Sequence, residues 1–373
     1  MQFSSIAEAQ NHARQWLFEY AAPLWSSTGV LADGMFAEKI GIDGQAKGEM
    51  DRRLRVQARQ IYSFCTLGRM GWKGPWRETA GTALDILLSR GVQNGQCVNL
   101  FSPAGEVIDR SRDLYDHAFA LFALAHAGAA LDRQDALETA EAIRMRMADW
   151  RRVEGGYWEG DLTPCPPYRQ NPHMHMYEAS WSHHQISPNS AWGKMADEIR
   201  ELFIGRLLDG ATGAVTEYFD EDWRPLPGET GNIVEPGHCL EWAWLLYVTS
   251  DEAESHAVAD GLAAFARKYG ICAERDIAIN EVYRDGSIRD AGARLWPQTE
   301  RLKAAIARYQ LTPGAIEEKE IIRAYGGLTH YFSTPVRGSW WDRMETDGSF
   351  VQEAAPASSF YHIVCALNEL NKL

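Results

Sequence analysis

The sequence predicts an all-α protein, an (α/α)6 barrel (toroid) with short β-hairpins in the loops on one rim. Twelve segments have helical periodicity, and six glycine-containing turns recur among them about every 63 residues. The segments at 113–131, 236–250 and 355–371 are apolar nearly all round, whereas their neighbours at 134–153 and 252–270 carry full polar faces. A helix that is apolar all round must be buried, so the even-numbered helices form an inner ring and the odd-numbered helices an outer ring.

The elements follow one another as repeated helical hairpins. The turns separate each odd helix from the even helix after it, so the long loops open on one rim, where a pocket is expected. We expect residues 1–373 to form a single catalytic domain. The predicted helices, in chain order, cover 6–24, 50–71, 75–91, 113–131, 134–153, 171–184, 190–207, 236–250, 252–270, 293–311, 313–327 and 355–371. The turns centre on Gly34, Gly105, Gly155, Gly213, Gly286 and Gly348.

Composition excludes several classes of protein. Of the 373 residues, 45% are hydrophobic and 24% are charged, which is typical of a globular chain with a large core. The net charge of −14 disfavours nucleic acid, because an acidic surface repels phosphates. The most apolar stretch, 115–131, is too short for a membrane span and contains Asp116. No secretory signal is visible and the six cysteines form no close pair, so we expect a cytoplasmic protein.

Three histidines lie near the starts of predicted inner helices: His175, His238 and His362. Two of them have a glutamate three residues later, Glu178 and Glu241, on the same helix face. A neighbouring carboxylate raises the pKa of a histidine and the helix N-terminus lowers it, which together favour acid–base catalysis near neutral pH. Any one such histidine is more often a structural group, but three on one rim favour a functional site.

Arginine, tryptophan and candidate metal ligands are the other informative residue types. Arg59 falls among apolar neighbours and is expected to point inward, toward either substrate or a structural carboxylate, while the other arginines of 52–60 suit a solvated turn. Aromatic rings suit the apolar faces of sugars. Five tryptophans are expected near the rim: Trp242, Trp244, Trp296, Trp340 and Trp341. No metal is expected, because the His/Glu order is the reverse of the Glu-x-x-His order of di-iron sites. Neither a phosphate-binding glycine motif nor Gly-x-Ser-x-Gly occurs.

Six runs together resemble the N-acylglucosamine 2-epimerase family, which includes aldose–ketose isomerases acting on mannose. They are 53–60 (RLRVQARQ), 114–119 (LYDHAF), 171–179 (NPHMHMYEA), 235–246 (EPGHCLEWAWLL), 296–300 (WPQTE) and 360–362 (FYH). The resemblance covers nearly the whole chain. It implies an (α/α)6 barrel and sugar isomerisation without a redox cofactor, so no cofactor is expected.

The same resemblance implies roles for single residues. His238 and His362 would be the acid/base pair at C1–C2 of the sugar, and His175 would assist ring opening or bind a hydroxyl. Glu241 would support His238, and Arg59 would contact sugar oxygens or the developing enediolate. Asn171, Glu178 and Trp296 are further substrate-site residues. An arginine that some isomerases place before the eighth helix has Arg224 as its nearest candidate.

These residues predict an aldose–ketose isomerase, D-mannose to D-fructose or a close analogue, acting through a cis-enediol(ate). The alternative in the same family is a 2-epimerase of an N-acylhexosamine or a disaccharide. An (α/α)6 glycoside hydrolase, which needs two opposed carboxylates, and a non-catalytic sugar-binding protein are less favoured. The expected partner is a small monosaccharide, with neither nucleic acid nor membrane, and a homodimer is kept open.

Overall fold

The computed structural model describes residues 3–188 and 191–373, and α-helices dominate it. The α-helices are α1 (Ile6–Gln15), α2 (Ala22–Ser27), α3 (Leu54–Arg69), α4 (Trp76–Ile86), α5 (Leu114–Leu131), α6 (Gln134–Arg146), α7 (Gln170–Ile186), α8 (Ala191–Leu202), α9 (Pro236–Thr249), α10 (Ala253–Tyr269), α11 (Trp296–Leu311), α12 (Ala315–His330) and α13 (Ser358–Asn371). Turns of π-helix at Trp16–Ala21, Leu87–Gly91 and Phe203–Leu207 join α1 to α2 and extend α4 and α8.

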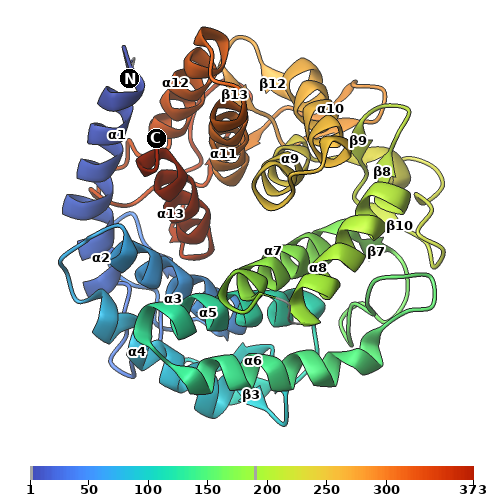
Figure 1. Ribbon diagram of the computed structural model, residues 1–373. Coiled ribbons are helices and arrows are strands. Elements are labelled where there is room, and N and C mark those ends of the chain that lie inside the picture. Colours follow the sequence, from blue (N-terminus) through green and yellow to red (C-terminus); the bar gives the residue numbers. More distant parts are fainter. Residues whose placement is uncertain (1–2, 189–190) are drawn as a thin grey trace.

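Two concentric rings of helices form the barrel (Figure 1). Helices α3, α5, α7, α9, α11 and α13 each contact the next, and α13 returns to α3, which closes the inner ring. The outer helices α4, α6, α8, α10 and α12 each pack on an inner helix, and α1 packs on α13. The predicted (α/α)6 barrel is thereby confirmed. The predicted helix at 190–207 is observed from 191 onward, because residue 190 lies outside the described residues.

Burial explains which helices are inner. Helix α5 has 14 buried residues and α9 has 13, on all sides of each helix. On the outer α6, only Ala136, Ala140 and Ile143 are buried. By length and hydropathy α5 also meets the criterion for a membrane span, but 78% of it is buried inside the protein, as the position of a core helix requires.

All six predicted turns are closed by short antiparallel pairing. Gly105, Gly213 and Gly286 lie in the hairpins β5–β6, β8–β9 and β14–β15, and the other three turns are closed by single bridges, 30–36, 151–157 and 344–350. The strands are β1 (Lys39–Ile40), β2 (Arg52–Arg53), β3 (Val92–Gln93), β4 (Gln96–Cys97), β5 (Leu100–Phe101), β6 (Val107–Asp109), β7 (Tyr168–Arg169), β8 (Leu208–Asp209), β9 (Ala214–Val215), β10 (Tyr218–Phe219), β11 (Ile233–Val234), β12 (Ile271–Cys272), β13 (Ile277–Ala278), β14 (Glu281–Tyr283), β15 (Ile288–Asp290), β16 (Ala293–Arg294), β17 (Arg343–Met344) and β18 (Ala355–Pro356).

These strands fix where the inner helices begin. The strands β2, β7, β11, β16 and β18 each lead into an inner helix, and each pairs with a strand of another rim loop. The start of α5 is held in the same way by a bridge between Asp113 and Gly160. The first turns of all six inner helices are therefore tied together at one rim, which is where the three histidines lie.

Candidate active site

A cavity of about 220 Å³ opens at this rim, over the first turns of the inner helices. It contains seven of the eight residues that the sequence nominated. Its lining consists of Arg59, Tyr115, Asn171, His175, Glu235, His238, Glu241, Arg294, Trp296, Asp342, Ser358, Ser359 and His362. The eighth nominated residue, Glu178, lies beneath His175 and hydrogen-bonds to it instead of lining the cavity.

Each of the three histidines donates a hydrogen bond from Nδ1 to a buried carboxylate. His175 bonds Glu178 at 3.1 Å, as their spacing on one helix face predicts. His238 bonds Glu217 at 2.9 Å, and His362 bonds Glu300 at 2.9 Å. A donor at Nδ1 leaves Nε2 as the second ring nitrogen of each histidine for contact with substrate. The rings of His238 and His362 both lie beside Trp296, with centroid distances of 4.9 and 5.7 Å.

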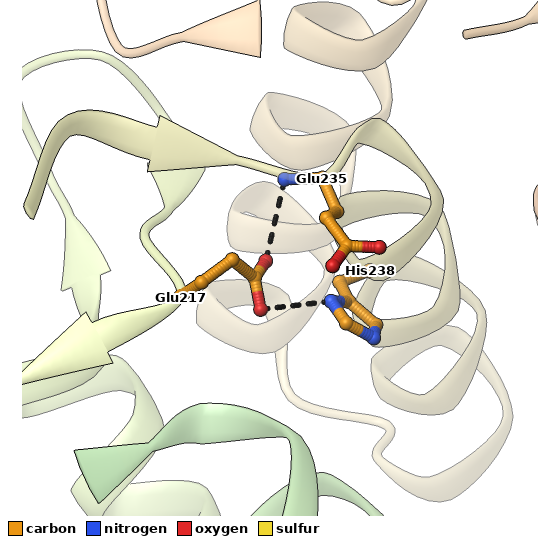
Figure 2. A group of neighbouring side chains, drawn as sticks. All are labelled: Glu217, Glu235 and His238. Atoms are coloured by element: carbon orange, nitrogen blue, oxygen red, sulfur yellow. Dashed lines mark hydrogen bonds and ion pairs between the residues drawn. The ribbon is translucent and has the colours of Figure 1, made fainter. Parts of the chain in front are cut away.

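Two carboxylates surround His238 (Figure 2). Glu217 accepts from Nδ1 of His238 and also from the backbone N–H of Glu235, whose side chain lies beside the ring. Burial opposes the imidazolium, but the charges of Glu217 and Glu235 outweigh it and raise the pKa of His238 to about 9. At neutral pH His238 is therefore protonated and able to donate a proton.

The other two histidines have the opposite charge state. Burial lowers the pKa of His362 to about 4, because the contact with Glu300 is offset by the nearby cations Arg59 and Lys303. Burial likewise lowers the pKa of His175 to about 4, against the contact with Glu178. Both are neutral at pH 7, and a neutral imidazole can accept a proton. Protonated His238 on α9 and neutral His362 on α13 thus lie on the two helices that flank α11, which carries Trp296.

Arg59 points into the cavity, as the sequence predicted, and only 6% of it is exposed. Its guanidinium donates to the hydroxyl of Tyr115 at 2.7 Å and to the carbonyl of Ser358 at 3.2 Å. Among the described residues no carboxylate lies within ion-pair distance, so the alternative of a structural ion pair is wrong. Its Nε, the Oδ1 of Asn171 and the Oε1 of Glu241 are buried without a hydrogen-bond partner in the described part of the chain.

Glu241, which was expected to support His238, does not hydrogen-bond its ring. The partner of His238 is Glu217, which comes from the loop before α9, whereas Glu241 lies 3.9 Å from Lys303. Sequence reasoning missed Glu217, which has no helical spacing to any histidine. Glu300 stood in the quoted 296–300 run, but only the fold brings it to His362.

Other sequence expectations need correction as well. Arg52, Arg53 and Arg55 do not form a solvated turn, because each is paired with a carboxylate of the rim. Arg224 is 73% exposed and paired with Asp222, away from the cavity. Of the five tryptophans only Trp296 lines the cavity. The other four lie outside this cavity. Trp242 stacks on Phe203, Trp340 on Trp25 and Trp341 on Phe350, and Trp244 lines a larger hollow of about 730 Å³. That hollow lies where the inner helices end and contains none of the three histidines.

Two groups near the cavity have the residue types of a metal site. In each, one ligand atom per residue lies within 4.8 Å of the others: Glu217, Glu235 and His238 in the first, and Glu241, Glu300 and His362 in the second. In the first group Glu235 is paired with Arg294 at 2.6 Å. In the second, the ammonium of Lys303 lies 2.6 Å from Glu300. One carboxylate of each group is thus already paired with a protein cation, and the donor sets suit hydrogen bonding to histidine.

Comparison with known proteins identifies the family of the chain. The model of the N-acylglucosamine 2-epimerase (GlcNAc 2-epimerase) family matches residues 34–366. A mannose-6-phosphate isomerase of Rhizobium meliloti (strain 1021) is 42% identical over 368 residues, which cover 95% of each chain. The structure of a D-mannose isomerase superposes with a TM-score of 0.87 at 21% identity, covering all of both chains. A cellobiose 2-epimerase from Bacillus thermoamylovorans B4167 gives a TM-score of 0.88 at 17% identity, covering 98% of this chain and 99% of the other. The chain belongs to the N-acylglucosamine 2-epimerase family and is an isomerase or epimerase of sugars.

Proposed function

We propose that the protein interconverts an aldose and a ketose of the D-mannose/D-fructose type, with His362 as the base and His238 as the acid. The observation that carries this proposal is that His238 and His362 lie beside one tryptophan in one cavity, each held through Nδ1 by a buried carboxylate. The charges around the two rings push their pKa values apart. Groups whose pKa values are pushed apart in this way are suited to the two halves of acid–base catalysis.

The chemistry follows from these positions. Neutral His362 removes the proton from C2 of the open-chain aldose, and the electrons move toward the C1 carbonyl to give a cis-enediol(ate). Protonated His238 and Arg59 stabilise the developing negative charge on oxygen. His238 gives its proton to the oxygen at C1. His362 then returns the C2 proton to C1, and the hydroxyl at C2 gives its proton to the now neutral His238 as it becomes the carbonyl, which yields the ketose and restores both histidines.

Substrate binding is assigned to the remaining nominated residues. Arg59, Asn171 and Glu241 each present a buried polar atom without a partner, as a site for sugar hydroxyls would. Trp296 supplies an aromatic face for the sugar ring. His175, held by Glu178, assists ring opening before the proton transfer.

We further propose that the substrate is an uncharged sugar. Of the cavity-lining side chains within 3–188 and 191–373, only Arg59 and Arg294 carry a permanent positive charge, and Arg294 is paired with Glu235. The acidic residues of the lining, Glu235, Glu241 and Asp342, offer a phosphate no positive charge. The relative named a mannose-6-phosphate isomerase makes this a point to test directly.

A 2-epimerase is the second candidate, favoured by the placement of histidines on two different inner helices. Return of the proton to C2 from the opposite face, by His238 instead of His362, would invert that carbon. The test is incubation with mannose, mannose 6-phosphate, N-acetylglucosamine and cellobiose, followed by identification of the products. Fructose from mannose supports the proposal, whereas an inverted aldose without ketose supports the epimerase, and turnover of mannose 6-phosphate alone refutes the uncharged substrate.

A further inference from the structure

Lys303 is a fully buried charge beneath the cavity. It lies on α11, one turn after Glu300, and its side chain has no exposed surface. Its Nζ lies 2.6 Å from Oε2 of Glu300, 3.9 Å from Oε1 of Glu241 and 3.7 Å from the ring centroid of Trp244. A buried ammonium is costly unless it is paired, so these contacts are what keeps Lys303 inside the barrel.

The carboxylate of Glu300 connects Lys303 to His362. One oxygen, Oε2, faces the ammonium, while the other accepts from Nδ1 of His362 at 2.9 Å and from the hydroxyl of Thr299 at 3.1 Å. Burial favours the protonated form of Glu300, but Lys303 and His362 outweigh burial and lower its pKa. Glu300 is therefore ionised although it is completely buried.

Glu241 shows what happens without such close pairing. It is as buried as Glu300, it lies farther from Lys303, and burial together with the neighbouring charge of Glu300 raises its pKa. Two buried carboxylates this close compete for a proton. The closer contact of Lys303 with Glu300 therefore favours the negative charge on Glu300 over one on Glu241.

We propose that Lys303 is a positioning residue that sets the tautomer of His362 by keeping Glu300 ionised. An ionised carboxylate can only accept, so Nδ1 of His362 carries the hydrogen and Nε2 keeps the lone pair that faces substrate. A protonated Glu300 could donate to Nδ1 and reverse the tautomer. This inference rests on the proposed function, in which His362 is the base.

The test is the pH profile of kcat for Lys303→Met, which removes the charge at similar length. Loss of a nearby cation makes the Glu300–His362 pair bind a proton more readily, so the acid limb moves to higher pH, by about one unit or more. The loss of kcat approaches about tenfold only at pH 4 and below, which is that same one-unit shift. At pH 7 kcat and KM change little, because both proteins lie well above their acid limbs. Lys319→Met, the same change at an exposed position on α12, is the control and should leave the profile unchanged.

A double variant keeps the test valid if the single variant does not fold. Lys303→Met with Glu300→Gln removes both charges and leaves no unpaired ion in the core. If Lys303 acts only through Glu300, the double variant has the kcat of Glu300→Gln alone. A double variant far slower than Glu300→Gln, or a folded Lys303→Met with the wild-type profile, overturns the inference. If His362→Ala keeps its turnover, it is the proposed function that fails, and the two failures are thereby distinguished.

Discussion

The same contact, a carboxylate on Nδ1, gives different charge states to His238 and His362. The difference comes from the next neighbours, since burial lowers the pKa of both rings. Around His238 a second carboxylate, Glu235, adds to Glu217. Around His362 the cations Arg59 and Lys303 offset Glu300. The immediate partner therefore orients each ring, and the surrounding charges decide which histidine holds the proton.

The pH dependence of kcat/KM follows from these two groups. His362 must be neutral, so activity is lost as the pH falls toward its pKa of about 4. His238 must be protonated, so activity is lost as the pH rises through its pKa of about 9. We predict a broad, bell-shaped dependence of kcat/KM on pH between these limits, measured with an uncharged aldose. Glu217→Gln should lower the pKa of His238 and move the alkaline limb to lower pH, and an unmoved limb would contradict the assignment of His238.

Substitution of the two histidines tests whether they act together. His238→Ala and His362→Ala should each reduce kcat by about 10²–10⁴-fold, the usual contribution of one acid–base group. The loss of kcat in the double variant should be far smaller than the product of the two single losses, because proton transfer already lacks one member. Circular dichroism serves as the control for folding. Near-normal turnover of either single variant would make His175 the replacement for the missing member.

At the residue scale the sequence predicted positions better than partners. His238 and His362 were placed correctly because each lies near the start of a helix that is apolar nearly all round, and Arg59 because its neighbours are apolar. The bond between His175 and Glu178 follows from helical spacing. The contacts of His238 with Glu217 and of His362 with Glu300 span different elements, so no local pattern could predict them.

At the scale of elements, the start of α9 depends on one glycine. A Cβ on Gly237 would lie 2.5 Å from the ring of Trp296, which real contacts do not tolerate. The absence of a side chain there lets α9 approach α11 closely enough for His238 and His362 to share Trp296. Gly237 stands in 235–246, one of the runs that resemble the family, but its contact with Trp296 depends on helix packing.

Gly237→Ala should therefore damage the site more than the fold. The new methyl group displaces Trp296, and a shift of that size at a catalytic site costs about 10–100-fold in kcat/KM. Gly261→Ala is the matched control, because Gly261 lies on the outer α10 and a Cβ there meets nothing within 4 Å. Equal kinetics of the two variants would show that the close approach of α9 to α11 is not needed for catalysis.

The short strands are the elements that sequence patterns described least. Turns at all six glycines were predicted, yet three of them close by a single bridge instead of a hairpin. The pairing of β7 with β10 and of β11 with β14 joins different loops, which local sequence does not encode. The π-helical turns were not predicted either, since they continue the helical segments at 6–24, 75–91 and 190–207.

At the scale of the whole molecule, repetition made the barrel predictable. A hairpin of helices repeated about every 63 residues can bury its apolar members only by closing a ring. Because outer and inner helices alternate along the chain, every long loop lies at one rim, together with the first turns of the inner helices. The cytoplasmic location, the homodimer and the single domain over 1–373 stay predictions.

The charges around the site predict that activity does not depend on metal ions. Lys303 and Arg294 are already paired with one carboxylate in each of the two groups beside the histidines. Exhaustive dialysis against a chelator should leave kcat and KM unchanged, with metal content checked by mass spectrometry. Loss of activity that one specific divalent ion restores would contradict histidine acid–base catalysis in this site.

The central claim, proton transfer by a histidine at C2, is tested most directly with mannose deuterated at C2. The protein is incubated with this sugar in ordinary water, and the deuterium in the fructose formed is measured by NMR. A histidine that takes up the label exchanges it with solvent, so the account predicts a primary isotope effect and fructose that has lost at least part of its label. Complete retention of deuterium at C1 would indicate direct hydride transfer from C2 to C1 and would contradict the account.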